Sequence, residues 1–354
     1  MALNSLFLLP NRFCSSFPPI CAVAGVPPIS RSISPQTTPF PLRFSAHAAQ
    51  SSGFPSVSAL SSTATPETSI FTWDDPVRAS QPEYAPGDSS DLSGFFEKIK
   101  FCNRGSLIGK SIFSPSRISV WFPGNRFEEV FVIKDSSSHG ARFGYCVTLH
   151  DKLGTPEERT VAVGEVIKCL VEEQEELIPG IQGELYPVTS LFGGRVYFSL
   201  ERVAAPYFGI KAYGIHMNGF VESGDEKLLW VAKRSLVKPT YPGCWIILLP
   251  EDWALLVGVV SYVDIDGDRF KRDVLFCYDL KLPESFVPKN QDGEVEGFNL
   301  MPVGSVAHIV RRTHFYKPNC SLVVIDFLFR HGYICPESLG YLDLLQSLRS
   351  GNCS

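Results

Sequence analysis

The 354-residue sequence has no apolar run near the roughly 20 residues that a membrane-spanning helix needs, so we expect no membrane partner. Lys and Arg are scattered rather than clustered, and the net charge is −5 at pH 7, so we expect no nucleic-acid partner either. The ten cysteines include no C-x-x-C pair and no Cys/His spacing of the zinc type. We therefore interpret them as reduced and mostly structural. The length alone predicts about two domains.

Acidic residues are absent from residues 1–66, which are rich in Ser, Pro and Ala and carry Arg12, Arg31 and Arg43. This composition is typical of a transit peptide for the chloroplast or the mitochondrion. The Ser content favours the chloroplast. The alternative is a disordered tail of low complexity.

Residues 67–90 are predicted to form a linker, because three prolines oppose regular structure: Pro76, Pro82 and Pro86. The first folded domain is predicted over residues 91–206. It opens with L-S-G-F-F-E-K-I-K-F-C-N-R-G, whose apolar spacing predicts a short helix that stops at Gly105. Further on, Thr155 and Glu158 form a capping box before an apolar repeat of helical period, which predicts a second helix.

The centre of the chain predicts a β-hairpin. Ile210–Val221 is an apolar-rich strand, Glu222–Glu226 is a polar turn, and Lys227–Lys233 is the return strand. Asp-Gly at residues 266–267 joins two more β-rich runs, Leu255–Ile265 and Arg269–Leu280. A helix is predicted over Cys320–His331. This mixture of elements predicts an α+β fold in two domains.

The hairpin and the Tyr241–Pro242–Gly243 turn that follows it resemble the opening of a Nudix hydrolase domain. The resemblance is to plant plastid Nudix hydrolases with a thiamine pyrophosphokinase-like domain in front, and it is nearly continuous from Val257 to Ser354. It implies a thiamine pyrophosphokinase-like domain over residues 91–206, a Nudix-type mixed sheet over residues 207–354, and a chloroplast location. It also implies hydrolysis of a small-molecule diphosphate with Mg²⁺ or Mn²⁺. The candidate substrates are thiamine diphosphate derivatives and oxidised nucleoside diphosphates such as 8-oxo-dGDP.

The motif that carries the family's metal ligands is G-x5-E-x7-R-E-U-x-E-E-x-G-U, where U is a bulky aliphatic residue. Glu residues three and four apart share one face of a helix, so several carboxylates converge on the cations. In this sequence only Cys244–Leu256 separates the Tyr-Pro-Gly turn from Val257, and the motif is absent. We therefore expect no catalytic residues, no bound metal and impaired hydrolysis. We also expect an uncovered sheet face, with lower stability or local disorder near Cys244–Leu256.

Two alternatives remain for a chain without this motif. It is a non-catalytic ligand-binding module, or it is the product of an aberrant transcript or gene model. The relatives' continuation M-L-D-H-L-V-A-G-G, read one base later, gives C-W-I-I-L-L-P-E, which is the sequence of Cys244–Glu251.

Four charged residues remain as candidate substrate contacts. Lys233 and Arg234 end the hairpin and can contact a phosphate, although an exposed strand end is an equal alternative. Glu294 and Glu296 follow a turn at which some Nudix enzymes place an extra acidic residue, a role that needs a metal beside it. His216 is interpreted as structural rather than as a ligand. The sequence leaves the oligomeric state open.

Overall fold

A computed structural model describes residues 72–85, 87, 91–107, 125–135, 145–173, 178, 181–237, 241, 243–246, 255–290 and 293–351. The chain divides into two units, Met1–Leu8 with Thr68–Ser354, and Leu9–Glu67. The second unit and the predicted transit peptide lie outside the described residues. In the described part of the chain, no helix is both long and apolar enough to cross a bilayer.

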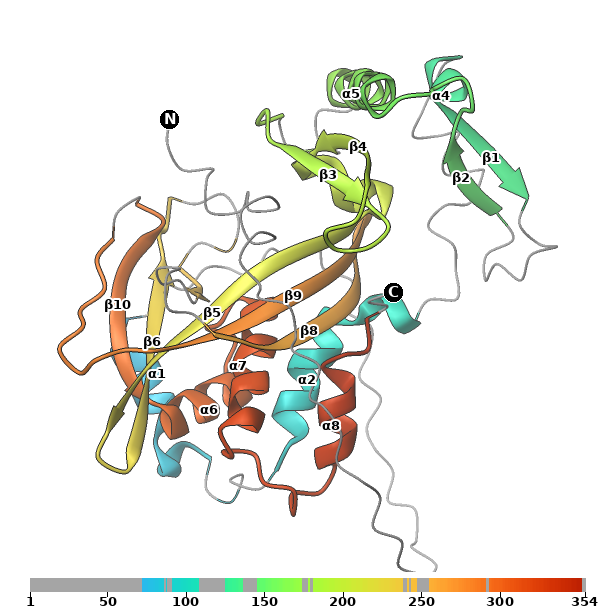
Figure 1. The fold of residues 1–354 in the computed structure, drawn as a ribbon. Coiled ribbons are helices and arrows are strands. Elements are labelled where there is room, and N and C mark those ends of the chain that lie inside the picture. The colour runs from blue at the N-terminus through green and yellow to red at the C-terminus, as the bar shows by residue number, and fades with distance from the viewer. Residues whose placement is uncertain are drawn as a thin grey trace, which may run out of the picture. The chain divides into compact units, whose positions relative to one another are not determined.

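The largest sheet has six strands, in the order β10-β6-β5-β9-β8 with β7 also paired to β6 (Figure 1). The strands are β5 (Lys211–Ser223), β6 (Glu226–Arg234), β7 (Trp245–Ile246), β8 (Leu255–Asp266), β9 (Arg269–Lys281) and β10 (Val295–Pro302). β5 and β9 run parallel, and the other neighbours are antiparallel. Both predicted hairpins are confirmed. Gly224 and Gly267 occupy their turns with φ of +59° and +60°, a backbone conformation that favours glycine.

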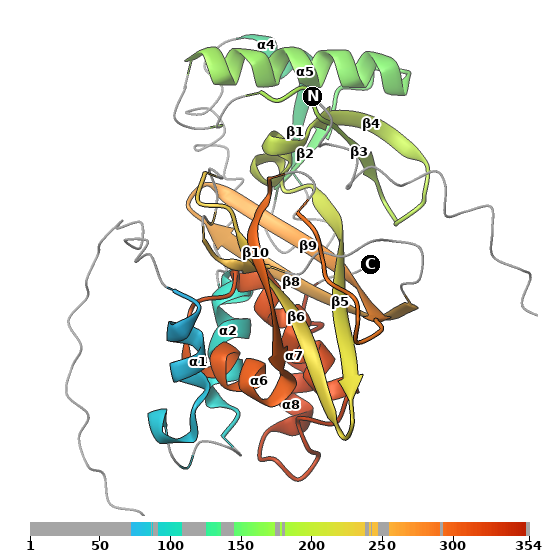
Figure 2. The same cartoon turned by 90° about the vertical axis from the view of Figure 1, so that its left-hand side faces the viewer.

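Helices cover one face of this sheet (Figures 1 and 2). They are α1 (Asp74–Ser80), α2 (Ser93–Cys102), α6 (Val303–Arg312), α7 (Pro318–Arg330) and α8 (Tyr341–Ser347). Every residue of α7 from Cys320 to Phe329 is buried, which confirms the predicted apolar helix there. Its Phe327 ring lies 5.8 Å from the ring of Phe220 in β5. The main core therefore lies between the sheet and α7.

Regular structure occurs within the predicted linker, residues 67–90, so the expectation that its prolines prevent it is wrong. Besides α1, the segment contains the 3-10 helix η3 (Pro82–Tyr84). Pro76 lies in the first turn of α1, where a missing N–H costs no helical hydrogen bond. Arg312 of α6 donates hydrogen bonds of 2.9 to 3.2 Å to three carbonyl oxygens of this segment, those of Ala79, Gln81 and Ala85. The segment is therefore fastened to α6 at several points.

A separate core lies in the chain before β5. Its elements are α4 (Asn125–Val130), β1 (Phe131–Asp135), β2 (Tyr145–Leu149), α5 (Pro156–Glu173), β3 (Leu185–Thr189), β4 (Val196–Glu201) and the 3-10 helix η6 (Arg202–Phe208). The capping box is confirmed, because the Glu158 N–H donates to Thr155 Oγ1 at 3.2 Å and the Thr155 N–H donates to Glu158 Oε2 at 3.1 Å. The α+β class is confirmed as well.

The helix α2 departs from the predicted domain plan. It lies in the range 91–206, yet Phe95, Ile99 and Cys102 are buried in the core of the six-stranded sheet. It also ends before Gly105, with Asn103 at its C-cap. Gly105 instead belongs to the 3-10 helix η4 (Arg104–Leu107). Packing therefore groups α2 with the C-terminal elements.

Candidate functional site

The four predicted substrate contacts meet where β6 pairs with β10. The antiparallel register places Arg234 opposite Val295 and Lys233 opposite Gly297. Lys233 Nζ lies 3.0 Å from Glu296 Oε1, and Arg234 forms an ion pair with Glu294. The sequence proposed these four residues separately, and the strand register joins them into two cross-strand pairs.

Burial decides between the two interpretations of the cations. The Lys233 side chain is 8% exposed and the Arg234 side chain 14%. The alternative of an exposed strand end is therefore wrong. Glu296 keeps 45% of its side chain exposed, so the Lys233 pair is open to solvent on that side. A phosphate that enters here has to compete with a glutamate for each cation.

Backbone hydrogen bonds fix the segment after β6 against Arg234. The Arg234 N–H donates to the Cys244 oxygen at 2.8 Å, and the Gly243 N–H donates to the Arg234 oxygen at 3.1 Å. Lys317, which precedes α7, places its Nζ 5.6 Å from the centroid of the Tyr241 ring.

Burial raises the pKa of the Cys244 thiol, and the charges of Lys317 and Arg234 oppose that rise only in part. Cys244 is therefore a neutral thiol and a poor nucleophile.

The carboxylates at this site do not fit a divalent-cation centre. Mg²⁺ and Mn²⁺ favour oxygen ligands that include carboxylates, whereas Glu294 and Glu296 each face a basic side chain. Among the residues that the structure describes, no group of three or more His, Cys, Asp or Glu side chains is arranged to hold a metal ion. Residues 247–254, in the middle of the shortened segment, lie outside the described part.

His216 lies in β5 on the side that faces α7. Its Nδ1 is 4.0 Å from Sγ of Cys320. Burial, together with the charge of Lys317, lowers the pKa of His216 to about 3. The imidazole is therefore neutral at physiological pH. These contacts favour its structural interpretation.

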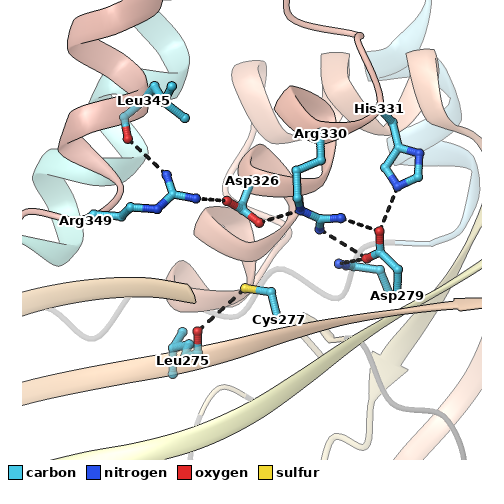
Figure 3. A network of polar contacts seen from close by, with 9 residues as sticks. Leu275, Cys277, Asp279, Asp326, Arg330, His331, Leu345 and Arg349 are labelled. Atoms are coloured by element: carbon cyan, nitrogen blue, oxygen red, sulfur yellow. Dashed lines mark hydrogen bonds and ion pairs between the residues drawn. The ribbon is translucent and has the colours of Figure 1, made fainter. Parts of the chain in front are cut away.

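A polar network that the sequence did not predict lies between the sheet and α7 (Figure 3). Asp326 accepts hydrogen bonds from Arg330 Nε and Arg349 Nη2, each at 2.8 Å. Asp279 of β9 accepts from Arg330 Nη2 at 3.1 Å and lies 2.7 Å from His331 Nε2. Asp326 is fully buried and Asp279 nearly so. The only sequence signal for this network is the i,i+4 spacing of Asp326 and Arg330 on one helix.

Both carboxylates of this network are fully engaged. Burial alone would raise the pKa of Asp279, but the hydrogen bonds from His331 and Arg330 outweigh it and lower the pKa. Asn218 also donates to Asp279 Oδ1 at 3.1 Å. A carboxylate held this way is a weak base, so we assign the network to structure rather than to chemistry. It joins β5, β9, α7 and the C-terminal segment.

Comparison with known proteins gives the following relationships. Residues 117–212 match the family described as a domain of unknown function (DUF4743). The chain is 51% identical over 330 residues to Nudix hydrolase 20, chloroplastic, of Arabidopsis thaliana, which covers 82% of this chain and 86% of that protein. It is 47% identical over 327 residues to Nudix hydrolase 24, chloroplastic, of the same plant, covering 82% and 87%.

A solved structure with a weaker similarity is the NUDIX domain of Shewanella oneidensis NrtR complexed with ADP ribose. It shares 11% identity and covers 33% of this chain and 86% of that chain, with a TM-score of 0.25. The plant relatives are both named chloroplastic, which confirms the predicted chloroplast location. The predicted thiamine pyrophosphokinase-like character of residues 91–206 stays a prediction.

Proposed function

The chain belongs to the Nudix hydrolase family, and from that premise we propose that it binds a small-molecule diphosphate and hydrolyses it poorly or not at all. The proposed ligands are thiamine diphosphate derivatives and oxidised nucleoside diphosphates such as 8-oxo-dGDP. Lys233 and Arg234 are the proposed phosphate contacts. Glu294 and Glu296 hold these two cations in place.

The observation that carries the proposal is the short connection after β7. Only Cys244–Leu256 separates the Tyr-Pro-Gly turn from Val257, and this stretch contains a single Glu and a single Asp, Glu251 and Asp252. Adjacent side chains diverge in a helix or a strand, so these two cannot converge on one ion. Hydrolysis of a diphosphate by this chemistry needs several carboxylates around Mg²⁺ or Mn²⁺. The chain has no equivalent cluster there.

The lengths of the alignments support a chain that is shorter than its relatives over the matched region. The alignment with Nudix hydrolase 20 runs over 330 positions, whereas 82% of 354 residues is about 290 residues. The alignment with Nudix hydrolase 24 runs over 327 positions with the same matched share of this chain. Each alignment therefore contains about 40 positions that have no residue in this chain.

A direct assay tests the proposal. The purified chain is incubated with Mg²⁺ or Mn²⁺ and thiamine diphosphate or 8-oxo-dGDP, and the release of phosphate and of monophosphate is measured. Binding of the same ligands is followed by calorimetry. We expect binding with little turnover. Robust magnesium-dependent turnover that a chelator abolishes would overturn the proposal, and so would a failure to bind either diphosphate.

A graft provides the matched control. A segment that carries the family motif G-x5-E-x7-R-E-U-x-E-E-x-G-U replaces Cys244–Leu256. We expect this variant to gain metal-dependent hydrolysis, because the binding surface is retained and the carboxylates are restored. Sequencing the transcript across Gly243–Val257 tests the alternative that the short connection arises from a one-base slip.

A further inference from the structure

The face of the six-stranded sheet that points away from α7 carries aromatic, aliphatic and cationic side chains. Side chains alternate along a strand, so Phe220, which packs on α7, places Tyr213 and Ile215 on the opposite side of β5. Arg272 and Phe276 of β9 lie on that same side, because the parallel register pairs Phe276 with Ile215. We call this surface the open face. Ile215 is 38% exposed on it, although it is apolar.

Three aromatic rings meet on the open face. Phe192 reaches it from the turn between β3 and β4, with its ring centroid 4.5 Å from that of Phe276 and 5.1 Å from that of Tyr213. The rings of Tyr213 and Phe276 lie 18° from parallel at 6.3 Å. Phe192 is nevertheless 59% exposed. The three rings therefore form a platform that keeps an accessible side.

The turn that carries Phe192 is held in place. The Gly194 N–H donates to the Leu191 oxygen at 3.0 Å, and Gly193 has a φ of +71°, which fits a tight turn. The Tyr186 hydroxyl of β3 accepts a hydrogen bond of 2.9 Å from the Tyr213 N–H, which ties the hairpin to β5. A ring presented in this way loses little freedom when a ligand stacks on it.

A guanidinium lies on the same face. Arg272 sits opposite Lys211 in the parallel register, four residues before Phe276. Four residues of strand span about 13 Å. Arg272 is partly buried and forms no ion pair or hydrogen bond with any residue in the described part of the chain. It can therefore take an anion without displacing a carboxylate, as a phosphate contact additional to Lys233 and Arg234, each of which is paired with a glutamate.

We propose that the open face binds a planar heteroaromatic ring on Phe192, Tyr213 and Phe276, and a phosphate joined to that ring on Arg272. Flat rings stack on aromatic side chains, and a cationic ring gains further from their π faces. A guanidinium pairs with phosphate through two parallel hydrogen bonds. The distance along β9 suits a ring and a phosphate separated by a short linker.

This site rests on the proposed function in one respect, since its ligand is the proposed diphosphate ester. It gives the segment 117–212, which matches the domain of unknown function, a role in recognising the ring. Phe192 is the residue of this segment that contacts the ring. The ring determines which diphosphate binds, and the short connection after β7, which lacks the cluster of carboxylates, determines that it is hydrolysed poorly or not at all.

Calorimetry on the full chain tests the site with four probes: thiamine diphosphate, 8-oxo-dGDP, thiamine without phosphate, and inorganic diphosphate. Phe192→Ala is expected to weaken the ester that binds by about tenfold and to leave inorganic diphosphate unchanged. Arg272→Gln is expected to weaken the ester by about tenfold and to leave unphosphorylated thiamine unchanged. The matched control is Tyr197→Ala, which removes an aromatic side chain of β4 that is 43% exposed. We expect this control to bind the ester and inorganic diphosphate as the wild type does.

The outcomes separate this inference from the proposed function. Undiminished binding of the ester by Phe192→Ala, with a native circular dichroism spectrum, overturns the ring site and leaves diphosphate binding intact. A complete failure of the wild-type chain to bind any diphosphate overturns both. Tighter binding of the thiamine ester supports a cationic ring as the ligand, and tighter binding of 8-oxo-dGDP supports a neutral base.

Discussion

The two faces of the six-stranded sheet differ in how completely their polar groups are matched. On the face that packs against α7, Asp326 of that helix is fully buried, and its carboxylate lies between the guanidinium groups of Arg330 and Arg349. On the open face, Arg272 has no partner among the described residues, and Phe192 and Ile215 remain exposed. Burying a charge without a partner is costly, so the matched face is built for stability. Groups left unmatched at a surface are available to a ligand.

The largest expected effect breaks the matched face. Asp326→Ala leaves the partly buried Arg330 and the exposed Arg349 without this fully buried carboxylate, and we expect a loss of about 3 kcal/mol in the free energy of unfolding. Urea denaturation measures it. The control is Glu222→Ala, because Glu222 pairs with Lys281 at the exposed end of β5 and its removal should leave the midpoint unchanged. Equal midpoints for both variants would remove the distinction between the faces.

Close packing on the helix side gives the second effect. A Cβ added at Gly94 of α2 would lie 2.4 Å from the backbone oxygen of Arg311 in α6. We expect Gly94→Ala to cost about 2 kcal/mol, because a helix has to move to relieve the clash. Gly164 of α5 has nothing within 4 Å of the added Cβ, and Gly164→Ala should stabilise by about 0.5 to 1 kcal/mol. Thermal unfolding of the two variants should therefore shift in opposite directions.

A smaller effect depends on pH. The folded pKa of His216 is about 3, against an ordinary value of 6.5, so the fold favours the neutral ring. This preference contributes stability above pH 6.5 and loses it as the pH falls towards 3. Between pH 7 and pH 5.5 we expect the wild-type free energy of unfolding to fall by about 1.3 kcal/mol on account of this residue. His216→Gln should flatten that slope, and an unchanged slope would contradict the assignment.

The smallest expected effect is on the open face. Ile215→Ala removes a side chain that already contacts water, so we expect a loss below about 1 kcal/mol. Val231→Ala in β6 truncates a fully buried side chain of the main core and should cost about 2 kcal/mol. Denaturant titration of the pair measures the contrast. A larger loss for Ile215→Ala than for Val231→Ala would show that the open face is packed after all.

Local signals in the sequence predicted much of this fold. A short stretch of neighbouring residues specifies each of three features: the capping box at Thr155, the Asp-Gly turn at Gly267 and the apolar helix from Cys320. Each of them appears in the structure. Such features depend on backbone geometry and on one or two side chains, so a short stretch of sequence specifies them.

Contacts between residues that lie far apart in the chain could not be predicted from the sequence. Nothing near Phe95 indicates that α2 packs on α7 rather than within residues 91–206. The pairing of Lys233 with Glu296 depends on the β6–β10 register, which the turn sequence does not reveal. The same holds for Phe192 and Phe276, which lie 84 positions apart in the numbering and meet only in the fold. These contacts join residues distant in the chain, and a single sequence carries no local signal for them.

The docking of α1 sets a limit on how the protein matures. Trp73 packs on the main core, and Arg312 of α6 donates hydrogen bonds to the backbone oxygens of Ala79, Gln81 and Ala85. Any cleavage that removes the predicted transit peptide, residues 1–66, has to fall upstream of Thr72 to keep this anchor. A cut further along would strip the anchor from α6 and leave the guanidinium of Arg312 without those three carbonyls.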